Sequence, residues 1–177
     1  MLVNDMPLLI EVLKFTIPFW LINISLNGVY VTKLIFPVVA KCDRPLDLYK
    51  QFSNGTRVLG NSTTVIGFFV AIIVGIIVQI FLGKDLEHSL QIGLISGLAV
   101  YFGHAIGSFI KRRFDYVDGA FMPFVDHGDY IILAGLIFGL MHEFSWTVIG
   151  VGVLITYILH PLFTYAAYLL KLHKQPL

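Results

Sequence analysis

The sequence contains little charge and almost no cysteine. Asp, Glu, Lys and Arg make up 13% of its 177 residues, whereas hydrophobic residues make up 57%. Soluble domains carry about 25% charge. The one cysteine, Cys42, cannot form an internal disulfide or a CxxC metal site. No basic run interleaved with aromatic residues suggests a nucleic-acid partner. This composition indicates an integral membrane protein whose length suits one bundle of helices.

Several familiar signatures are also missing. No internal repeat is visible, which weakens a transporter built from inverted halves. The histidines lack the HxxxH or HExxH spacing of a zinc site, and no glycine-rich loop ends in the GK[ST] of a Walker A motif. Asp5, Glu11 and Lys14 interrupt the first apolar stretch, and no small-x-small cleavage site follows it. We therefore expect no cleaved signal peptide.

The long apolar stretches predict an all-α integral membrane protein, a bundle of about five transmembrane helices in a single domain over residues 1–177. The predicted spans are roughly 8–36 (broken by Pro18), 65–82, 90–110, 123–142 and 146–170, with a cytoplasmic loop at 37–64. The basic residues gather in this loop, after the third span and in the tail. The positive-inside rule then places the N-terminus outside and the C-terminus in the cytoplasm.

The fourth predicted span explains the position of two aspartates. Its apolar run, residues 130–141, reaches only about 18 Å, well short of a hydrocarbon core of about 30 Å. A start near Pro123 restores the length and places Asp126 and Asp129 in the first turns, on one face of the helix. Ionised side chains there must face protein or a wet cavity, so these two carboxylates are the best candidates for metal ligands.

The cations Lys111, Arg112 and Arg113, directly after the third span, permit two interpretations. They can act as a topological stop that binds anionic lipid, or they can bind phosphate. The aspartates that follow favour phosphoryl or nucleotidyl chemistry, because carboxylates hold Mg²⁺ and cations neutralise phosphate charge. Two simpler alternatives remain for Asp126 and Asp129: a helix-dipole pair, or salt bridges to the three cations.

The loop at residues 45–64 and the polar residues of the spans are less specific. The loop opens onto the second span at Thr64, which suits either an anion site or ordinary Ser/Thr capping. His104 shares a possible polar stripe with Ser108 and Lys111, and we expect a hydrogen-bonded histidine rather than a zinc ligand. Asn23 is expected to hydrogen-bond between helices, and the GxxxG pairs of the third span indicate close helix packing.

Taken together, these segments resemble the CDP-archaeol synthases, membrane cytidylyltransferases related to phosphatidate cytidylyltransferase. GSFIKRR is followed by G-x-x-x-P-x-x-D-x-x-D, which ends at Asp126 and Asp129. The first loop is similar to the family pattern P-x-D-x-x-K-x-F-x-x-G-x-R-x-x-G, beginning at Pro45 and ending at Gly60. The tail HPLFTYAAYLLKLHKQP is similar as well. The resemblance extends from about Asn27 to the end of the chain.

The resemblance implies an enzyme of the cell membrane, multi-pass, with its active site facing the cytoplasm. It would transfer CMP from CTP to the phosphate of an ether-lipid glycerol phosphate, releasing pyrophosphate, with Mg²⁺ as cofactor. Asp126 and Asp129 would hold Mg²⁺ and, with Lys111, would be catalytic. The residues that would bind the nucleotide or phosphates are Asp47, Lys50, Arg57, Thr64, Ser108, Arg112 and Arg113.

Four positions depart from the family pattern. The G-D-x-K-T turn before the second span has Asn61 and Thr63 in place of its aspartate and lysine, the G-D pair before GSFIKRR has His104, and a tail asparagine is Thr164. These departures motivate an alternative from another class, a non-catalytic membrane homologue that binds lipid or a partner. A CDP-alcohol phosphotransferase is disfavoured because its D-x-x-D-G start, at Asp115, is not followed by the rest of the motif.

Overall fold

The described part of the computed structural model is built from helices and loops. It covers residues 7–35, 38, 41, 43–53, 55–82, 85–117, 120, 122 and 124–169. Its helices are α1 (Leu8–Ile35), α3 (Val65–Phe81), α4 (Leu86–Arg113), α5 (Val125–Leu140) and α6 (Trp146–Leu169). The described residues contain no β-strand, only two isolated bridges, Pro45 with Thr64 and Gln51 with Arg57, which fold the first loop back on itself. The all-helical class is therefore confirmed.

Two helices differ from the sequence prediction. Helix α4 extends beyond 90–110 at both ends. It begins at Leu86 because Asp85 caps its first turn by accepting from the His88 amide at 2.9 Å. The cations Lys111 to Arg113 consequently lie on its last turn, where positive charge complements the helix dipole, rather than in a loop. Helix α1 continues through Pro18 as one helix, so the predicted break at that proline was wrong. Membrane helices tolerate a proline where neighbouring groups satisfy the freed carbonyl.

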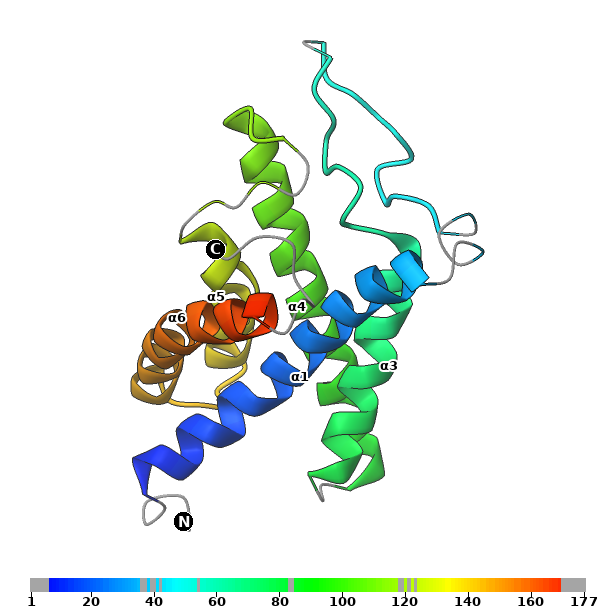
Figure 1. Cartoon of the computed structure of the whole chain (residues 1–177). Helices are drawn as coiled ribbons and strands as arrows, with labels where there is room; N and C mark the ends of the chain where they lie inside the picture. Colours follow the sequence, from blue (N-terminus) through cyan, green and yellow to red (C-terminus); the bar gives the residue numbers. More distant parts are fainter. Residues whose placement is uncertain are drawn as a thin grey trace.

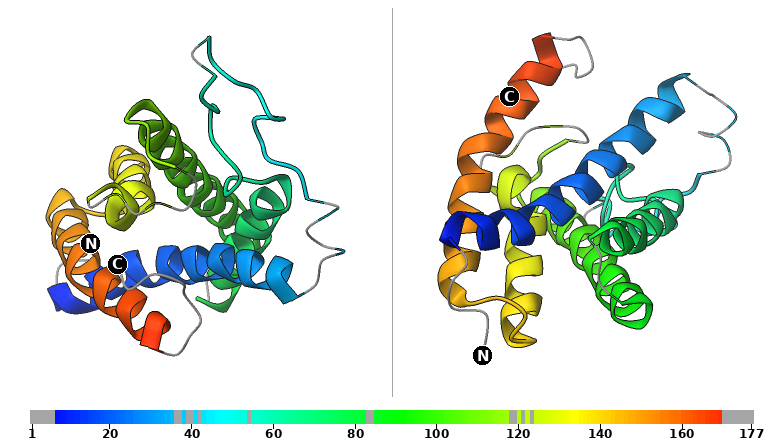
Figure 2. Two further views of the ribbon diagram at one scale, coloured as in Figure 1. Left: turned by 45° about the horizontal axis from the view of Figure 1, so that its top comes forward. Right: turned by 90° about the horizontal axis from the view of Figure 1, so that it is seen from below.

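Helix α4 forms the centre of the molecule. It packs along α3 on one side and α5 on the other, while α1 crosses obliquely and also contacts α3 and α6 (Figures 1 and 2). The first loop rises above α3 beside the C-terminal end of α4 (Figure 1). This arrangement brings the loop, the end of α4 and the start of α5 to the same end of the bundle.

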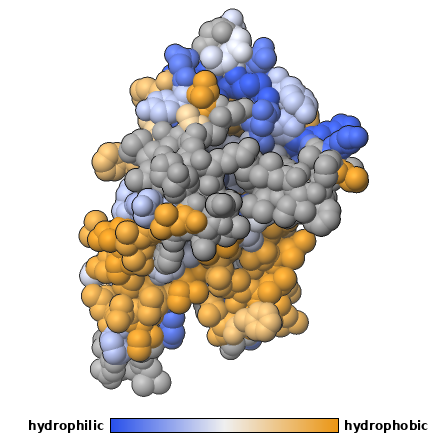
Figure 3. All heavy atoms as spheres, viewed as in Figure 1, coloured by the Kyte–Doolittle hydropathy of each residue, from blue (hydrophilic) through white to orange (hydrophobic). Residues whose placement is uncertain are grey.

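The outer surface is apolar over much of the bundle. Figure 3 shows a hydrophobic region over the helices and hydrophilic residues gathered at the end that carries the first loop and the end of α4. Leu8–Val29 and Leu86–Arg113 are long and apolar enough to cross a membrane, and Val65–Phe81 and Trp146–Leu162 are shorter apolar helices. Exposed large side chains include Phe69 and Ile73 on α3 and Leu154 and Ile158 on α6. These outward faces suit lipid.

Glycines allow α3 and α4 to approach closely, as the GxxxG pair Gly93/Gly97 predicted. The buried face of α3 is Gly67, Ala71, Gly75 and Gln79, one residue per turn. A Cβ built on Gly97 would lie 2.5 Å from the Ala71 carbonyl oxygen and 2.7 Å from the Ile72 Cα. Because these neighbours are backbone atoms, no side-chain rotation can make room. Close backbone contact is a common basis of helix association in membranes.

Gly97→Ala is expected to lower the free energy of unfolding by about 1–3 kcal/mol, the usual cost of overpacking. The measurement is thermal or denaturant unfolding of the purified protein in detergent. Gly150→Ala on α6 is the matched control, since a Cβ there meets nothing within 4 Å, and we expect it to change stability by no more than about 1 kcal/mol. Equal stability of the two variants would refute the close-packing argument.

Candidate active site

Lys111 and Asp126 form a short ion pair between α4 and α5. The Lys111 Nζ lies 2.6 Å from Asp126 Oδ1 and also donates to the Ala120 carbonyl at 3.2 Å. Asp126 Oδ2 accepts the Met122 amide at 2.7 Å. Helix α5 begins after Phe124, whose side chain makes no capping hydrogen bond. The Asp126 carboxylate therefore ties the segment before α5 to its first turn while it neutralises the lysine.

Asp129 lies one turn further along α5, on the same face, in a closely confined position. Its side chain is only 7% exposed. Oδ1 accepts the Tyr130 amide at 2.6 Å, and Oδ2 lies 3.1 Å from His104 Nδ1 on α4. The carboxylate rests against Gly107, where any Cβ would collide with Asp129 Oδ2. The GxxxG pair Gly103/Gly107 thus makes room for the Asp129 side chain as well as for helix packing.

Asp47 and Arg57 hold the first loop together. The Arg57 Nη2 lies 2.6 Å from Asp47 Oδ1, and its Nη1 donates to Asn61 Oδ1 at 3.0 Å. Asp47 also accepts the amides of Tyr49 and Leu59 at 3.1 and 3.0 Å. Burial alone would raise the pKa of the Asp47 carboxyl, but these hydrogen bonds and the Arg57 charge outweigh it, so its pKa lies below the ordinary value. The pair organises the loop.

Arg113 and Ser108 connect this loop to α4. The Arg113 Nη2 donates to Thr56 Oγ1 and to the Arg57 carbonyl, both at 3.1 Å, and its guanidinium lies 3.7 Å from the centre of the Phe52 ring. Thr63 donates to Ser108 at 3.2 Å across a buried contact. The loop is therefore held against the end of α4, beside the helix turn that carries Lys111.

The remaining predicted site residues lie at different places around the first loop and the end of α4. Thr64 caps α3 by accepting the Gly67 amide at 3.3 Å, and its carbonyl accepts from the Tyr101 hydroxyl at 2.7 Å. The capping alternative weighed for this loop is thus realised at Thr64. Arg112 is buried and donates to the Tyr116 carbonyl. Lys50 is exposed on the loop. Asp118, Gly119 and Pro123 lie outside the described residues.

A cavity of about 270 Å³ lies between the first loop and the end of α4. Its walls include two guanidinium-bearing side chains, Arg57 and Arg112, together with Thr56, Asp115, Tyr116 and Val117. The structure thus groups the predicted residues into two adjacent sets. Lys111, Asp126 and Asp129 form one set between α4 and α5. Arg57 lines the neighbouring cavity, and the carboxylates of Asp126 and Asp129 are not among the described residues that line it.

The two carboxylates on α5 fit a magnesium site with few protein ligands. Mg²⁺ is usually held by one or two carboxylates together with waters and substrate phosphates. Among the described contacts, each of the four oxygens of Asp126 and Asp129 accepts from one N–H group, and a carboxylate oxygen can accept more than one bond. No group of three or more His, Cys, Asp or Glu side chains that could hold a metal occurs among the described residues. A cage made of protein ligands alone is not found there.

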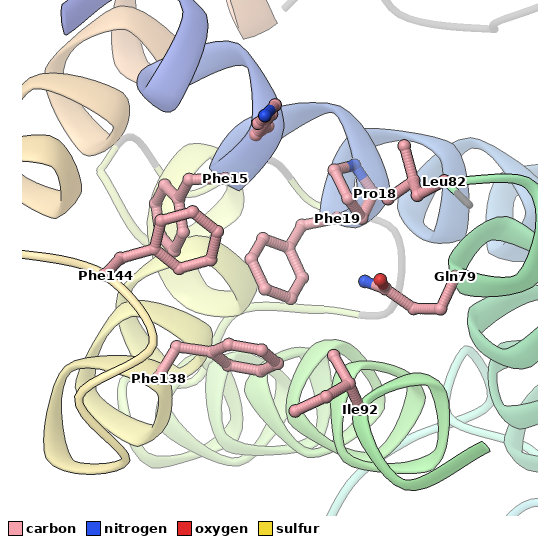
Figure 4. A pocket seen from close by; sticks show the side chains of 9 residues that line it. Phe15, Pro18, Phe19, Gln79, Leu82, Ile92, Phe138 and Phe144 are labelled. Carbon is pink, nitrogen blue, oxygen red and sulfur yellow. The ribbon is translucent and has the colours of Figure 1, made fainter. Parts of the chain in front are cut away.

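Another cavity, of about 240 Å³, lies at the opposite end of α4. Figure 4 shows the rings of Phe15, Phe19, Phe138 and Phe144 around it, with the Gln79 amide pointing toward Phe19. Lys14 also lines it, and no carboxylate does. Among the described residues that line it, this aromatic cavity therefore offers one cation and no carboxylate ligand for a metal.

Comparison with known proteins identifies the family of the chain. The sequence profile of the CarS-like CDP-archaeol synthases matches residues 8–177. The chain belongs to the CDP-archaeol synthase family. The CDP-archaeol synthase of Methanopyrus kandleri is 37% identical over 138 residues, which cover 75% of this chain and 79% of that protein. The CDP-archaeol synthase of Archaeoglobus fulgidus is 32% identical over 165 residues, covering 80% and 88%.

A solved structure supports the fold of this CDP-archaeol synthase family member. It is described as an intramembrane enzyme for archaeal membrane lipids biosynthesis. It superposes with a TM-score of 0.61 at 23% identity and covers 84% of this chain and 89% of that chain. The family profile and the relatives confirm the predicted resemblance, and the superposition shows that this chain shares the fold of that enzyme.

Sequence reasoning missed one polar feature of the bundle, the contact between two histidines of α5 and α6. His127 Nδ1 lies 2.9 Å from His160 Nδ1. One signal was available in the sequence, because His160 interrupts a long apolar run, and ionisable residues inside membrane segments usually face the bundle interior. The interhelical role predicted for Asn23 and the hydrogen-bonded role predicted for His104 are confirmed, since the two side chains meet at 2.8 Å.

Proposed function

We propose that this chain transfers CMP from CTP to the phosphate of a lipid glycerol phosphate, with an archaeal-type ether lipid as the acceptor. The observation that carries the proposal is the pairing of Lys111 with Asp126 beside Asp129, next to a cavity lined by Arg57 and Arg112. Family membership supplies the reaction class. The products are a CDP-lipid and pyrophosphate, as phospholipid biosynthesis requires.

In the proposed reaction, an oxygen of the lipid phosphate attacks the α-phosphorus of CTP in line, and the bond to the β-phosphate oxygen breaks. Asp126 and Asp129 would hold Mg²⁺, which when bound would neutralise triphosphate charge and stabilise the leaving pyrophosphate. Lys111 would place its ammonium beside the same phosphates. Arg57 and Arg112 would bind phosphate oxygens from the neighbouring cavity, because a guanidinium fork matches phosphate geometry. The chain mainly supplies positioning and charge.

The residues that depart from the family pattern support this role. His104 holds Asp129, Thr63 bonds Ser108, and Asn61 accepts from Arg57. Three of the four replacements therefore have a partner within the site or the loop beside it, and the fourth, Thr164, donates to the His160 carbonyl of its own helix at 3.0 Å. These contacts join the replaced positions to Asp129, Ser108 and Arg57, which favours an enzyme over the non-catalytic homologue.

The experiment that tests the proposal is incorporation of labelled CTP into lipid by the full chain purified in detergent. Ether and ester glycerol phosphates are offered as acceptors, with Mg²⁺ and with no divalent metal. We expect Mg²⁺-dependent CDP-lipid formation that is faster with the ether acceptor. Glu87→Gln serves as a control, because Glu87 is an exposed carboxylate in the first turn of α4, at the other end of the bundle. No product with any acceptor or divalent metal would support the non-catalytic alternative.

A further inference from the structure

A series of hydrogen-bonded polar side chains joins four helices inside the bundle, and it begins at Asp129. His104 on α4 lies 3.1 Å from Asp129 Oδ2 and, through its other ring nitrogen, 2.8 Å from Asn23 on α1. Asn23 in turn lies 3.4 Å from His160 on α6. His160 then meets His127, which returns the series to α5 at 2.9 Å. We call these side chains, from Asp129 to His127, the polar ring.

The chemistry of the side chains in the polar ring determines which atom donates the hydrogen bond between His104 and Asp129. An ionised carboxylate only accepts, so the Nδ1 of His104 must donate to Asp129 Oδ2. In a neutral imidazole the Nε2 of His104 is then an acceptor. The structure turns the Asn23 oxygen to His104 Nε2 at 2.8 Å and the Asn23 NH₂ to His160 Nε2 at 3.4 Å. The two ends of an amide have nearly the same shape, so the same side chain, turned over, offers a donor to His104 Nε2 and an acceptor to His160. An amide at position 23 is the side chain that satisfies one histidine as acceptor and the other as donor.

The surroundings leave Asp129 little freedom. Gly107 allows the carboxylate to lie against the α4 backbone, and the Tyr130 amide holds Oδ1 at 2.6 Å. His104 is the side-chain group bonded to Oδ2 among the described contacts, and its ring packs beside the buried Tyr130 ring, with 5.3 Å between the ring centres. The rotation of the carboxylate about its Cβ–Cγ bond therefore depends on His104.

We infer that His104 is a positioning residue for Asp129, and that Asn23 fixes the ring of His104 in the orientation this requires. The inference rests on the proposed function of Asp129. Its basis is the geometry of the contacts from α1 through α4 to α5. A group that orients a metal-binding carboxylate commonly changes metal affinity or activity by about 10–100-fold when removed. A histidine that only fills space between helices would have no such effect.

Two substitutions of His104 separate positioning from packing. The nitrogen of an asparagine side chain is attached to Cγ, as Nδ1 is in histidine, whereas the nitrogen of glutamine is one carbon further out, near the place of Nε2. His104→Asn thus preserves the donor to Asp129, and His104→Gln preserves the contact with Asn23. We expect kcat of CMP transfer to stay within about 5-fold of wild type for His104→Asn and to fall about 10–100-fold for His104→Gln, with little change in KM for CTP.

A second readout avoids turnover altogether. Binding of Mn²⁺ alone to the detergent-purified protein, followed by electron paramagnetic resonance, is expected to weaken about 10-fold or more in His104→Gln and to stay near wild type in His104→Asn. Asn23→Ala is expected to weaken Mn²⁺ binding in the same direction. Ser25→Ala is its control on α1, because the Ser25 hydroxyl bonds only the Ile22 carbonyl of its own helix among the described contacts.

The outcomes distinguish the inference from the function on which it rests. An active wild-type protein in which both His104 variants lose kcat and thermal stability equally would give His104 a packing role and overturn the inference alone. Wild-type protein that neither turns over CTP nor binds Mn²⁺ would overturn the proposed function, and the positioning role with it. A fall in kcat and in Mn²⁺ binding that is confined to His104→Gln, while the two variants have similar melting temperatures, supports the positioning role.

Discussion

Asp129→Asn is expected to lower the rate of CMP transfer by about 10²–10³-fold, as does the loss of one preorganised charge-stabilising group in other enzymes. Asparagine keeps the shape of the side chain but lacks the negative charge that would hold Mg²⁺. Its amide also fits the surroundings poorly. Both oxygens of Asp129 face N–H donors, from His104 and from the Tyr130 amide, and asparagine can accept only one of them through its single oxygen.

That mismatch also has an effect on stability. Leaving a buried donor without an acceptor costs about 1–3 kcal/mol, so the melting temperature of Asp129→Asn should fall modestly while the protein remains folded. The measurement combines labelled-CTP incorporation with thermal unfolding in detergent. Glu87→Gln, the exposed carboxylate control on α4, should leave both unchanged. Transfer at the wild-type rate by folded Asp129→Asn would refute the assignment of Asp129 as a metal ligand.

The order and the class of the helices could be predicted from the sequence because long apolar runs have few alternatives in a membrane. The ends of the helices were harder to predict. Helix α4 begins four residues before the expected start, since Asp85 provides a cap that apolar periodicity does not reveal. Lys111, Arg112 and Arg113 then fall on the helix, which determines the direction in which each side chain points. The side of the membrane on which the N-terminus lies stays a prediction.

The candidate site was predictable in its residue types and only partly in its contacts. Helical spacing predicts that Asp126 and Asp129 share a face, and a salt bridge from the three cations was one expected alternative; Lys111 makes it, at 2.6 Å. The partner of Asp129 could not be read from spacing. Its distance from His104 depends on how closely α4 and α5 approach, and Gly103 and Gly107, which carry no charge, permit that approach.

In the first loop, too, the sequence predicts the residue types of the site but not their contacts. Asp47 was predicted beside the nucleotide and Arg57 was predicted to bind phosphate. In the structure the two side chains pair with each other, and Asp47 also accepts from the loop backbone. A sequence pattern that spaces an acid and a base by ten residues does not distinguish a ligand-binding pair from a pair that closes a loop. The cavity beside Arg57 and Arg112 keeps phosphate binding as a prediction for these guanidinium groups, because both line it.

Gly107→Ala is expected to lower CMP transfer by about 10²-fold, although it adds only one methyl group and removes no functional side chain. The added Cβ would collide with Asp129 Oδ2 and would lie 3.0 Å from both the Cβ and the Cγ of Asp129. The carboxylate must therefore swing away from α4 and lose the His104 contact, or the two helices must separate. A displacement of about 1 Å at a reacting centre commonly costs about 10²-fold in rate.

The comparison with Gly103→Ala separates these two responses. A Cβ at Gly103 would lie 2.5 Å from the Tyr130 Cα and 2.8 Å from the Asp129 carbonyl oxygen, so it would push the α5 backbone rather than the carboxylate alone. We expect Gly103→Ala to lower the melting temperature more than Gly107→Ala, and Gly107→Ala to weaken Mn²⁺ binding at a melting temperature nearer wild type. Wild-type transfer and Mn²⁺ binding by Gly107→Ala would show that the carboxylate does not need its place against α4. Because Gly107 has no side chain and the added Cβ would meet Asp129, the effect of Gly107→Ala measures how strictly the bundle must position one oxygen atom.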